Sequence, residues 1–245
     1  NRQVHVFDEG KGAYFTFPQG EPSLKSPIGI AVDENGNIFV TDSTEAVVRV
    51  FNDHGKKYIR EIGRGMLSRP AGITVNHTTN ELLVVDTLKS EVIRFDLSDY
   101  RVKGAIRRGA RDTGMFHYPT NISVSGNGLI FVTDSLNFRI QVFSPEGAFL
   151  NSFGQPGNRP GYFARPKGVA VDTDGNIYVV DSLFDNVQIF NSEGSLLMDF
   201  GSPGHDYGKF WLPTGIFIDK KNRIYVSDTY NNRVQIFQYI KGGAY

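Results

Sequence analysis

Two kinds of side chain that can transfer protons or bind metals recur along the chain. An Asp followed by Ser or Thr recurs at a spacing of 44 to 48 residues, at Asp42, Asp86, Asp134, Asp181 and Asp228. Histidine also occurs five times, without a common spacing, at His5, His54, His77, His117 and His205. Carboxylates and imidazoles can act as acids and bases or ligate zinc and calcium. The lack of Cys excludes thiol catalysis, and no Gly-x-Ser-x-Gly, Walker or His-Glu-x-x-His motif is present.

The five Asp residues belong to a repeat that begins with Pro and ends with Phe. Its copies start 43 to 49 residues apart, at Pro27, Pro70, Pro119, Pro166 and Pro213. In the first copy, β-type segments at 30–32 and 38–40 flank an Asp-x-x-Gly-Asn turn, and a further segment follows at 48–51. A fourth segment ends in an apolar residue and Gly. Four short antiparallel strands per copy predict the blades of an all-β propeller.

The blade count follows from the two ends of the chain. Residues 1–26 hold two strands, half a blade, and the repeats span 27–69, 70–118, 119–165, 166–212 and 213–245, the last with three strands. In a five-bladed ring, residues 4–7 and 234–237 would compete for one position. We therefore favour six blades, the first and last incomplete here, in one domain over 1–245; five blades is the alternative. Asn121 stands where other copies have Gly, which predicts a positive φ there.

The repeat spelling resembles the NHL-repeat β-propellers, including bacterial NHL proteins. The resemblance is close over 154–190 and 201–237 and covers almost the whole chain. It implies the propeller fold, and the bacterial members make the periplasm or cell exterior the preferred location. Some similar propellers are enzymes, notably the amidating lyase of peptide-hormone maturation, whose zinc is held by histidines with Tyr and Arg nearby.

The loops between blades vary most, and they predict the binding face. They carry nine Lys or Arg and three Asp or Glu, although the whole chain has 26 of each sign. Phe116, Phe163 and Phe210 in these loops are expected to be buried. The candidate contact residues are Arg69, Arg107, Arg108, Arg111, His117, Tyr118, Arg159, Tyr162, Arg165, Lys167, His205 and Trp211.

The repeated Asp side chains are predicted to cap turns rather than act chemically. Each of them ends a second strand just before a Ser or Thr. Arg139 and Arg233, five residues after their Asp, are expected to pair with neighbouring blades.

These features favour a non-enzymatic binding scaffold without a cofactor. Its loop face would contact a protein partner or an anionic or polar ligand, and the incomplete terminal blade could accept an added strand. One alternative is a metal-dependent lyase or hydrolase of the amidating-lyase type, using His117, His205 and an Asp with zinc, or calcium bound by carboxylates. A second is an RNA-binding NHL domain. The balanced net charge disfavours nucleic acid, and no apolar run is long enough to span a membrane.

Overall fold

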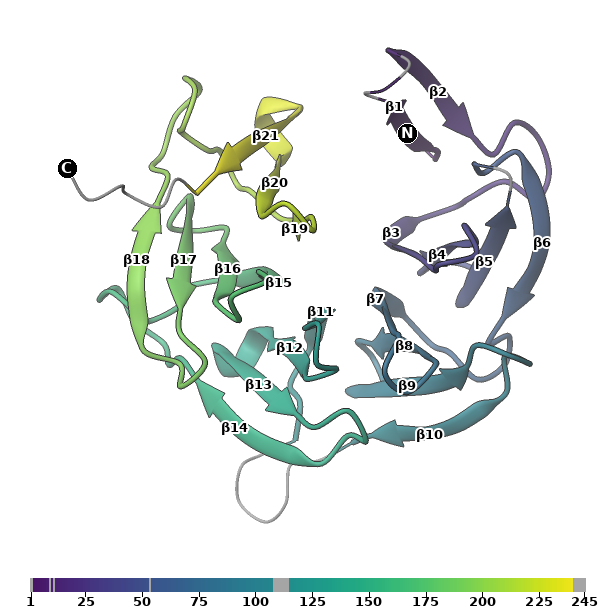
Figure 1. Cartoon of the computed structure of the whole chain (residues 1–245), viewed down its shortest axis with the longest axis horizontal. Helices are drawn as coiled ribbons and strands as arrows, with labels where there is room; N and C mark the ends of the chain where they lie inside the picture. The colour runs from purple at the N-terminus through teal and green to yellow at the C-terminus, as the bar shows by residue number, and fades with distance from the viewer. Residues whose placement is uncertain (1, 9, 11, 53, 108–114, 240–245) are drawn as a thin grey trace. The chain divides into compact units, whose positions relative to one another are not determined.

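The computed structural model describes residues 2–8, 10, 12–52, 54–107 and 115–239 (Figure 1). Apart from two single-turn 3-10 helices, the regular structure of these residues is antiparallel β-strand. Neither described helix has the length and apolar character that crossing a membrane requires. The chain forms two compact units, Asn1–Arg107 and Arg108–Tyr245, which are described separately.

The first unit holds one two-stranded and two four-stranded sheets. The two-stranded sheet pairs β1 (Val4–Asp8) with β2 (Ala13–Phe17). The first full blade contains β3 (Pro27–Val32), β4 (Ile38–Asp42), β5 (Val47–Asn52) and β6 (Lys57–Ile62). The second contains β7 (Pro70–Asn76), β8 (Glu81–Asp86), β9 (Glu91–Asp96) and β10 (Val102–Ile106).

The second unit continues the same pattern. One blade contains β11 (Pro119–Val124), β12 (Ile130–Asp134), β13 (Arg139–Phe143) and β14 (Phe149–Phe153). The next contains β15 (Pro166–Val171), β16 (Ile177–Asp181), β17 (Asn186–Phe190) and β18 (Leu196–Phe200). A three-stranded sheet follows, with β19 (Ile216–Ile218), β20 (Arg223–Asp228) and β21 (Arg233–Gln238). The helices η1 (Ser135–Asn137) and η2 (Thr229–Asn231) follow β12 and β20. Within this unit, Figure 1 shows β11, β15 and β19 on the inner side of their sheets and β14 and β18 on the outer side.

The observed strands confirm the predicted four-stranded antiparallel blades of a propeller. The described residues hold 21 strands, and each repeated Asp is the last residue of its blade's second strand. The predicted Asp-x-x-Gly turn is also present: Asp33 Oδ1 accepts N–H bonds from Asn35 at 3.0 Å and Asn37 at 2.8 Å, and Gly36 has a φ of 76°. These local signals were readable because a tight turn tolerates few residue types.

Apolar side chains fill the space between successive sheets within each unit. In the first unit, Phe39 and Val50 pack with Leu82 and Phe95 of the next blade. In the second, Phe131 packs with Val179 and Phe190. The loop residues Phe116, Phe163 and Phe210 are at most 4% exposed, as predicted. Second strands such as β12 and β16 are buried throughout because both of their faces are covered.

Neighbouring blades are also joined by hydrogen bonds from hydroxyl groups, and their backbones approach closely at a repeated glycine. Ser135 Oγ donates a hydrogen bond to the carbonyl of Pro166 at 2.9 Å, and Ser182 Oγ donates to that of Pro213. A Cβ added to Gly168 would lie 2.8 Å from the Thr214 carbonyl oxygen and 2.9 Å from the Ile216 nitrogen. The glycine is therefore required by close approach to the next blade's backbone.

This finding corrects the prediction for Asn121. The residue lies in β11 and is not among those with positive φ, and neither are Gly29 and Gly168 at the equivalent positions. At Gly29 and Gly168, crowding by the backbone of the next blade, rather than a left-handed backbone, restricts the residue type.

We expect Gly168→Ala to lower the free energy of unfolding by about 2 kcal/mol, because the new Cβ must displace backbone atoms of the next blade. Gly126→Ala is the matched control, since Gly126 has ordinary φ and open space around its Cβ position. Its effect should stay within about 0.5 kcal/mol. Denaturant unfolding of both variants measures the difference, and equal stabilities would contradict the crowding explanation.

Candidate functional site

A buried carboxylate at the end of each second strand holds the loop that precedes the same blade. In the second unit, Asp134 accepts the His117 N–H at 2.6 Å, and Asp228 accepts the Trp211 N–H at 2.8 Å. Asp181 accepts N–H bonds from Ala164 at 2.7 Å and from Arg165 at 3.0 Å. All three side chains are fully buried. The loop residues are thus positioned by hydrogen bonds to a charged acceptor, which are stronger than bonds between neutral groups.

The first unit uses the same interaction. Asp42 accepts the N–H groups of Lys25 at 2.6 Å and Ser26 at 3.0 Å, and Asp86 accepts those of Ser68 and Arg69. The Asp side chains therefore bond to the turn that follows them and also to the loop before their blade.

The prediction that Arg139 and Arg233 pair with neighbouring blades is wrong. Arg139 Nε donates to Asp134 at 2.9 Å and Arg233 Nε donates to Asp228 at 2.8 Å, each within its own sheet. Antiparallel pairing of β20 with β21 places Arg233 directly opposite Asp228, and Arg139 faces Asp134 in the same way. Register, which spacing alone does not show, decides the partner.

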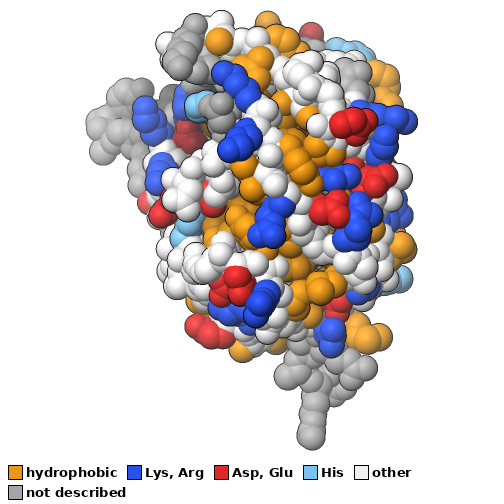
Figure 2. All heavy atoms as spheres, turned by 90° about the vertical axis from the view of Figure 1, so that its right-hand side faces the viewer, with side chains coloured by type: hydrophobic (Ala, Val, Ile, Leu, Met, Phe, Trp, Pro, Cys, Tyr) orange, Lys and Arg blue, Asp and Glu red, His pale blue; other side chains and the backbone are white. Residues whose placement is uncertain are grey.

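Much of the predicted loop charge is neutralised. Arg107 Nε contacts Glu91 at 2.6 Å, Arg64 pairs with Glu61 and Glu45, and Lys209 contacts Asp206 at 3.1 Å. On the side of the molecule shown in Figure 2, cationic and anionic side chains are interspersed. The partners are mainly glutamates near the loops rather than the repeated Asp residues.

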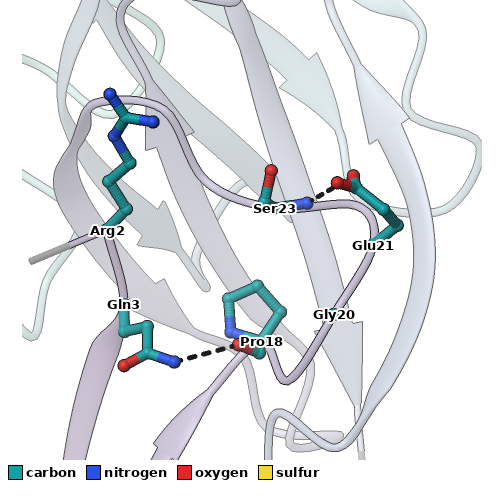
Figure 3. A pocket seen from close by; sticks show the side chains of 6 residues that line it. All are labelled: Arg2, Gln3, Pro18, Gly20, Glu21 and Ser23. Atoms are coloured by element: carbon teal, nitrogen blue, oxygen red, sulfur yellow. Dashed lines mark hydrogen bonds between the residues drawn. The ribbon is translucent and has the colours of Figure 1, made fainter.

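The remaining candidates of the first unit and the adjoining segment do not gather into a site. Arg69 is held through its backbone by Asp86, whereas Arg108 and Arg111 lie outside the described residues. A pocket of about 490 Å³ lies near the start of β1 and the end of β2 (Figure 3). It is lined by Arg2, Gln3, Pro18, Gly20, Glu21 and Ser23, none of which was predicted as a site residue.

Several candidates of the second unit have structural contacts. Tyr162 lies against Gly157, and its carbonyl accepts a bond from Gln188 Nε2 at 2.9 Å. Arg159 is exposed, and its carbonyl accepts the Tyr162 N–H. Tyr118 is partly buried with a φ of 60°. Arg165 and Lys167 flank Pro166 at the start of β15.

His205, in the loop before β19, contacts other side chains that could form a site. His205 Nδ1 lies 2.7 Å from Asn231 Oδ1, and the imidazole and the Trp211 ring are perpendicular with centroids 5.0 Å apart. Trp211 also contacts Tyr230 at 5.3 Å between ring centroids. His205, Trp211 and Tyr230 are all exposed. Two predicted residues, His205 and Trp211, are thus brought together.

The hydrogen bonds fix the tautomer of His205. Asn231 Nδ2 donates to the Gly204 carbonyl at 3.0 Å and to Asp228 Oδ2 at 2.8 Å, so the amide oxygen faces the imidazole. An amide oxygen only accepts, and Nδ1 of His205 must therefore carry the hydrogen. The lone pair of the neutral ring lies on Nε2, which makes no hydrogen bond to the described residues. Nε2 is available to accept a proton from a bound molecule.

Tyr230 and Asn231 were missed from the sequence, although a signal for Asn231 was present. Asn occurs three residues after the repeated Asp only at Asn137 and Asn231, where other copies have Glu45, Lys89 or Phe184. Asn137 makes the equivalent bonds, to Asp134 at 2.8 Å and the Met115 carbonyl at 3.0 Å. An amide at this position therefore links the buried carboxylate to the loop.

The three-ligand zinc site implied by the resemblance does not fit the described residues. Among these residues, no group of three or more His, Asp or Glu side chains is placed to hold an ion. Asp228 is occupied by hydrogen bonds, and His205 Nδ1 is bound to Asn231. We therefore derive no reaction step through a metal.

Comparison with known proteins supports the fold and is relevant to the choice between a binding scaffold and an enzyme. The family described as 6-bladed beta-propeller matches residues 24–121 and 109–183, and an NHL repeat matches residues 210–237. A probable peptidyl-alpha-hydroxyglycine alpha-amidating lyase of Caenorhabditis elegans is 28% identical over 145 residues. That match covers 49% of this chain and 41% of the relative, less than half of either protein.

Solved structures show the same fold at low identity. A streptogramin B lyase has a TM-score of 0.70 at 16% identity, covering 98% of this chain and 77% of that one. The virginiamycin B lyase of Staphylococcus aureus has a TM-score of 0.69 at 15% identity, covering 98% and 78%. The expectation of a non-enzymatic binding scaffold is contradicted by the amidating-lyase relative, which favours the lyase alternative.

We expect Asp228→Asn to lower the free energy of unfolding at pH 7 by about 3 kcal/mol, because it removes one partner of a buried ion pair. Burial alone would raise the pKa of Asp228, but hydrogen bonds from Trp211, Asn231, Arg233 and Gln235 outweigh it and lower the pKa. Because the pKa of Asp228 is lower in the folded state, its ionisation stabilises the fold at pH values above the unfolded-state pKa, near 3.8. This contribution is lost as the pH falls through the folded-state pKa.

The difference between wild type and Asp228→Asn should therefore shrink below about pH 4. Denaturant unfolding at pH 7 and pH 3 measures it. Asp206→Asn, which changes an exposed ion pair, should cost at most about 1 kcal/mol at either pH. A pH-independent effect at Asp228 would contradict the carboxylate's role.

Proposed function

This chain belongs to the 6-bladed beta-propeller family, and we propose that it is a lyase with His205 as its proton-transfer residue. The hydrogen bond from His205 Nδ1 to Asn231 Oδ1 carries the proposal, because it leaves Nε2 free to act as a base. The 28% identity to an amidating lyase supports the reaction class.

In the proposed lyase reaction, a base removes a proton while a C–N bond breaks. The step consumes no water and involves no oxidation or reduction. For a substrate with a hydroxyl on the carbon that bears an amide nitrogen, His205 Nε2 takes the hydroxyl proton. The oxygen electron pair forms the carbonyl, the C–N bond breaks, and its electrons remain on nitrogen. The imidazolium returns the proton to that nitrogen, so the residue ends in its starting state.

His205 is better positioned for this step than His117. The described contacts of His117 are made by its backbone, which bonds to Asp134 and Leu136. Asn231 holds one nitrogen of the His205 ring, and the Trp211 ring packs perpendicular to it. The two contacts limit rotation of the imidazole. Trp211 and Tyr230 supply exposed aromatic surface for a peptide-derived substrate beside the base.

We expect His205→Gln to reduce kcat for cleavage of a peptidyl-alpha-hydroxyglycine by about 100- to 10,000-fold, because Gln cannot take a proton. Formation of the peptide amide measures the rate. His77→Gln is the control, since His77 lies near Glu34 in the first unit and should keep wild-type activity. Absence of turnover by the folded wild-type chain, or full activity of His205→Gln, would overturn the proposal.

Asn231→Ala tests whether the tautomer matters. Losing the acceptor for Nδ1–H should lower kcat by about 10- to 100-fold with little change in KM, as for other residues that orient a ligating or catalytic imidazole. The ¹⁵N chemical shifts of the His205 ring should at the same time show a larger population with hydrogen on Nε2. A fall in kcat with unchanged ring shifts would indicate that Asn231 acts by another route.

A further inference from the structure

We propose that Arg165 and Lys167, at the start of β15, form a binding site for a small oxyanion, a carboxylate or a phosphate group. The site lies in the second unit and is argued independently of the proposed lyase reaction. Guanidinium and ammonium groups together are well suited to such anions, because both donate charge-assisted hydrogen bonds.

Arg165 and Lys167 form no ion pair with an Asp or Glu among the described residues, whereas the loop cations Arg64 and Arg107 do. Arg139 and Arg233 each contact a buried Asp, and Lys209 contacts Asp206. Asp181, the carboxylate of the same blade, accepts N–H bonds from Ala164, Arg165, Leu183 and Phe184. Its oxygens thus accept backbone N–H groups, and among the described residues Asp181 forms no ion pair with the Arg165 or Lys167 side chain.

Burial of Lys167 makes the lack of an anionic partner unfavourable in free energy. Lys167 is partly buried, and burial, followed by the charge of Arg165, lowers its pKa. The two side chains are attached two residues apart, on either side of Pro166, so their positive charges repel each other. A bound anion would relieve the repulsion and supply the hydrogen-bond acceptor that a desolvated ammonium group lacks.

The backbone between the two cations is held from both sides. The Pro166 carbonyl accepts a hydrogen bond from Ser135 Oγ at 2.9 Å, and Ser135 Oγ lies 2.7 Å from Thr120 Oγ1. On the other side, Gly168 lies against the backbone of Thr214 and Ile216. This clamping keeps the attachment points of both side chains in place, which reduces the entropy lost on binding.

Calorimetric titration of the whole chain with inorganic phosphate and, separately, with oxalate tests the site and identifies the anion class. We expect at least one of them to bind, and Arg165→Gln with Lys167→Met together to weaken Kd by about ten- to a hundredfold or more. Lys220→Met is the matched control, because Lys220 is an exposed lysine in the turn after β19. It should leave Kd unchanged.

Acylation of Lys167 by an amine-reactive ester, located by peptide mapping, gives a second measurement. The anion that binds should slow acylation of Lys167 and not that of Lys220. Unfolding curves confirm that the variants fold. The proposal is overturned if neither anion binds wild type at millimolar concentration, or if the double variant binds as tightly as wild type.

Discussion

The interaction on which the candidate site depends is the capture of loop N–H groups by a buried carboxylate. Each Asp at the end of a second strand is fixed by the ladder of its sheet, so it presents oxygens at a constant place in every blade. The loop before the blade must then pass over this carboxylate with its N–H groups pointing inward. Apart from buried residues such as Phe163 and Phe210, loop residues can change while this contact is kept, because it involves only the loop backbone.

The conserved geometry of that contact explains what the sequence could predict. Strand limits, the Asp-x-x-Gly turns and the burial of Phe163 and Phe210 follow from local rules about turns and apolar packing. The Gly that recurs two residues after the Pro of four copies was recognised, but the positive φ expected from it at Asn121 was wrong. A Cβ clash with the next blade depends on tertiary distance, and no local pattern reports it.

The candidate site was less predictable because it depends on pairing between side chains. His205 and Trp211 were identified individually, whereas Asn231, which fixes the His205 tautomer, was not. Likewise Arg233 was assigned to another blade although cross-strand register places it opposite Asp228. Composition also indicated a cationic loop face, but glutamates such as Glu61 and Glu91 neutralise Arg64 and Arg107. Contacts between segments distant in sequence decide each of these points.

One buried Asp thus serves both stability and proposed chemistry in the last sheet. Asp228 binds the Trp211 N–H, Asn231 and Arg233, and through Asn231 it determines which nitrogen of His205 is free. In the blade of Asp181, Phe184 replaces that Asn, and the carboxylate contacts backbone only. The buried Asp is therefore linked through Asn231 to an exposed imidazole in one blade. In the other blade, Arg165 and Lys167 form no ion pair with the described residues, Asp181 included. The two blades differ three and five residues after the Asp, with Asn231 and Arg233 in one and Phe184 and Asn186 in the other. A repeat built for packing can acquire distinct sites through such differences.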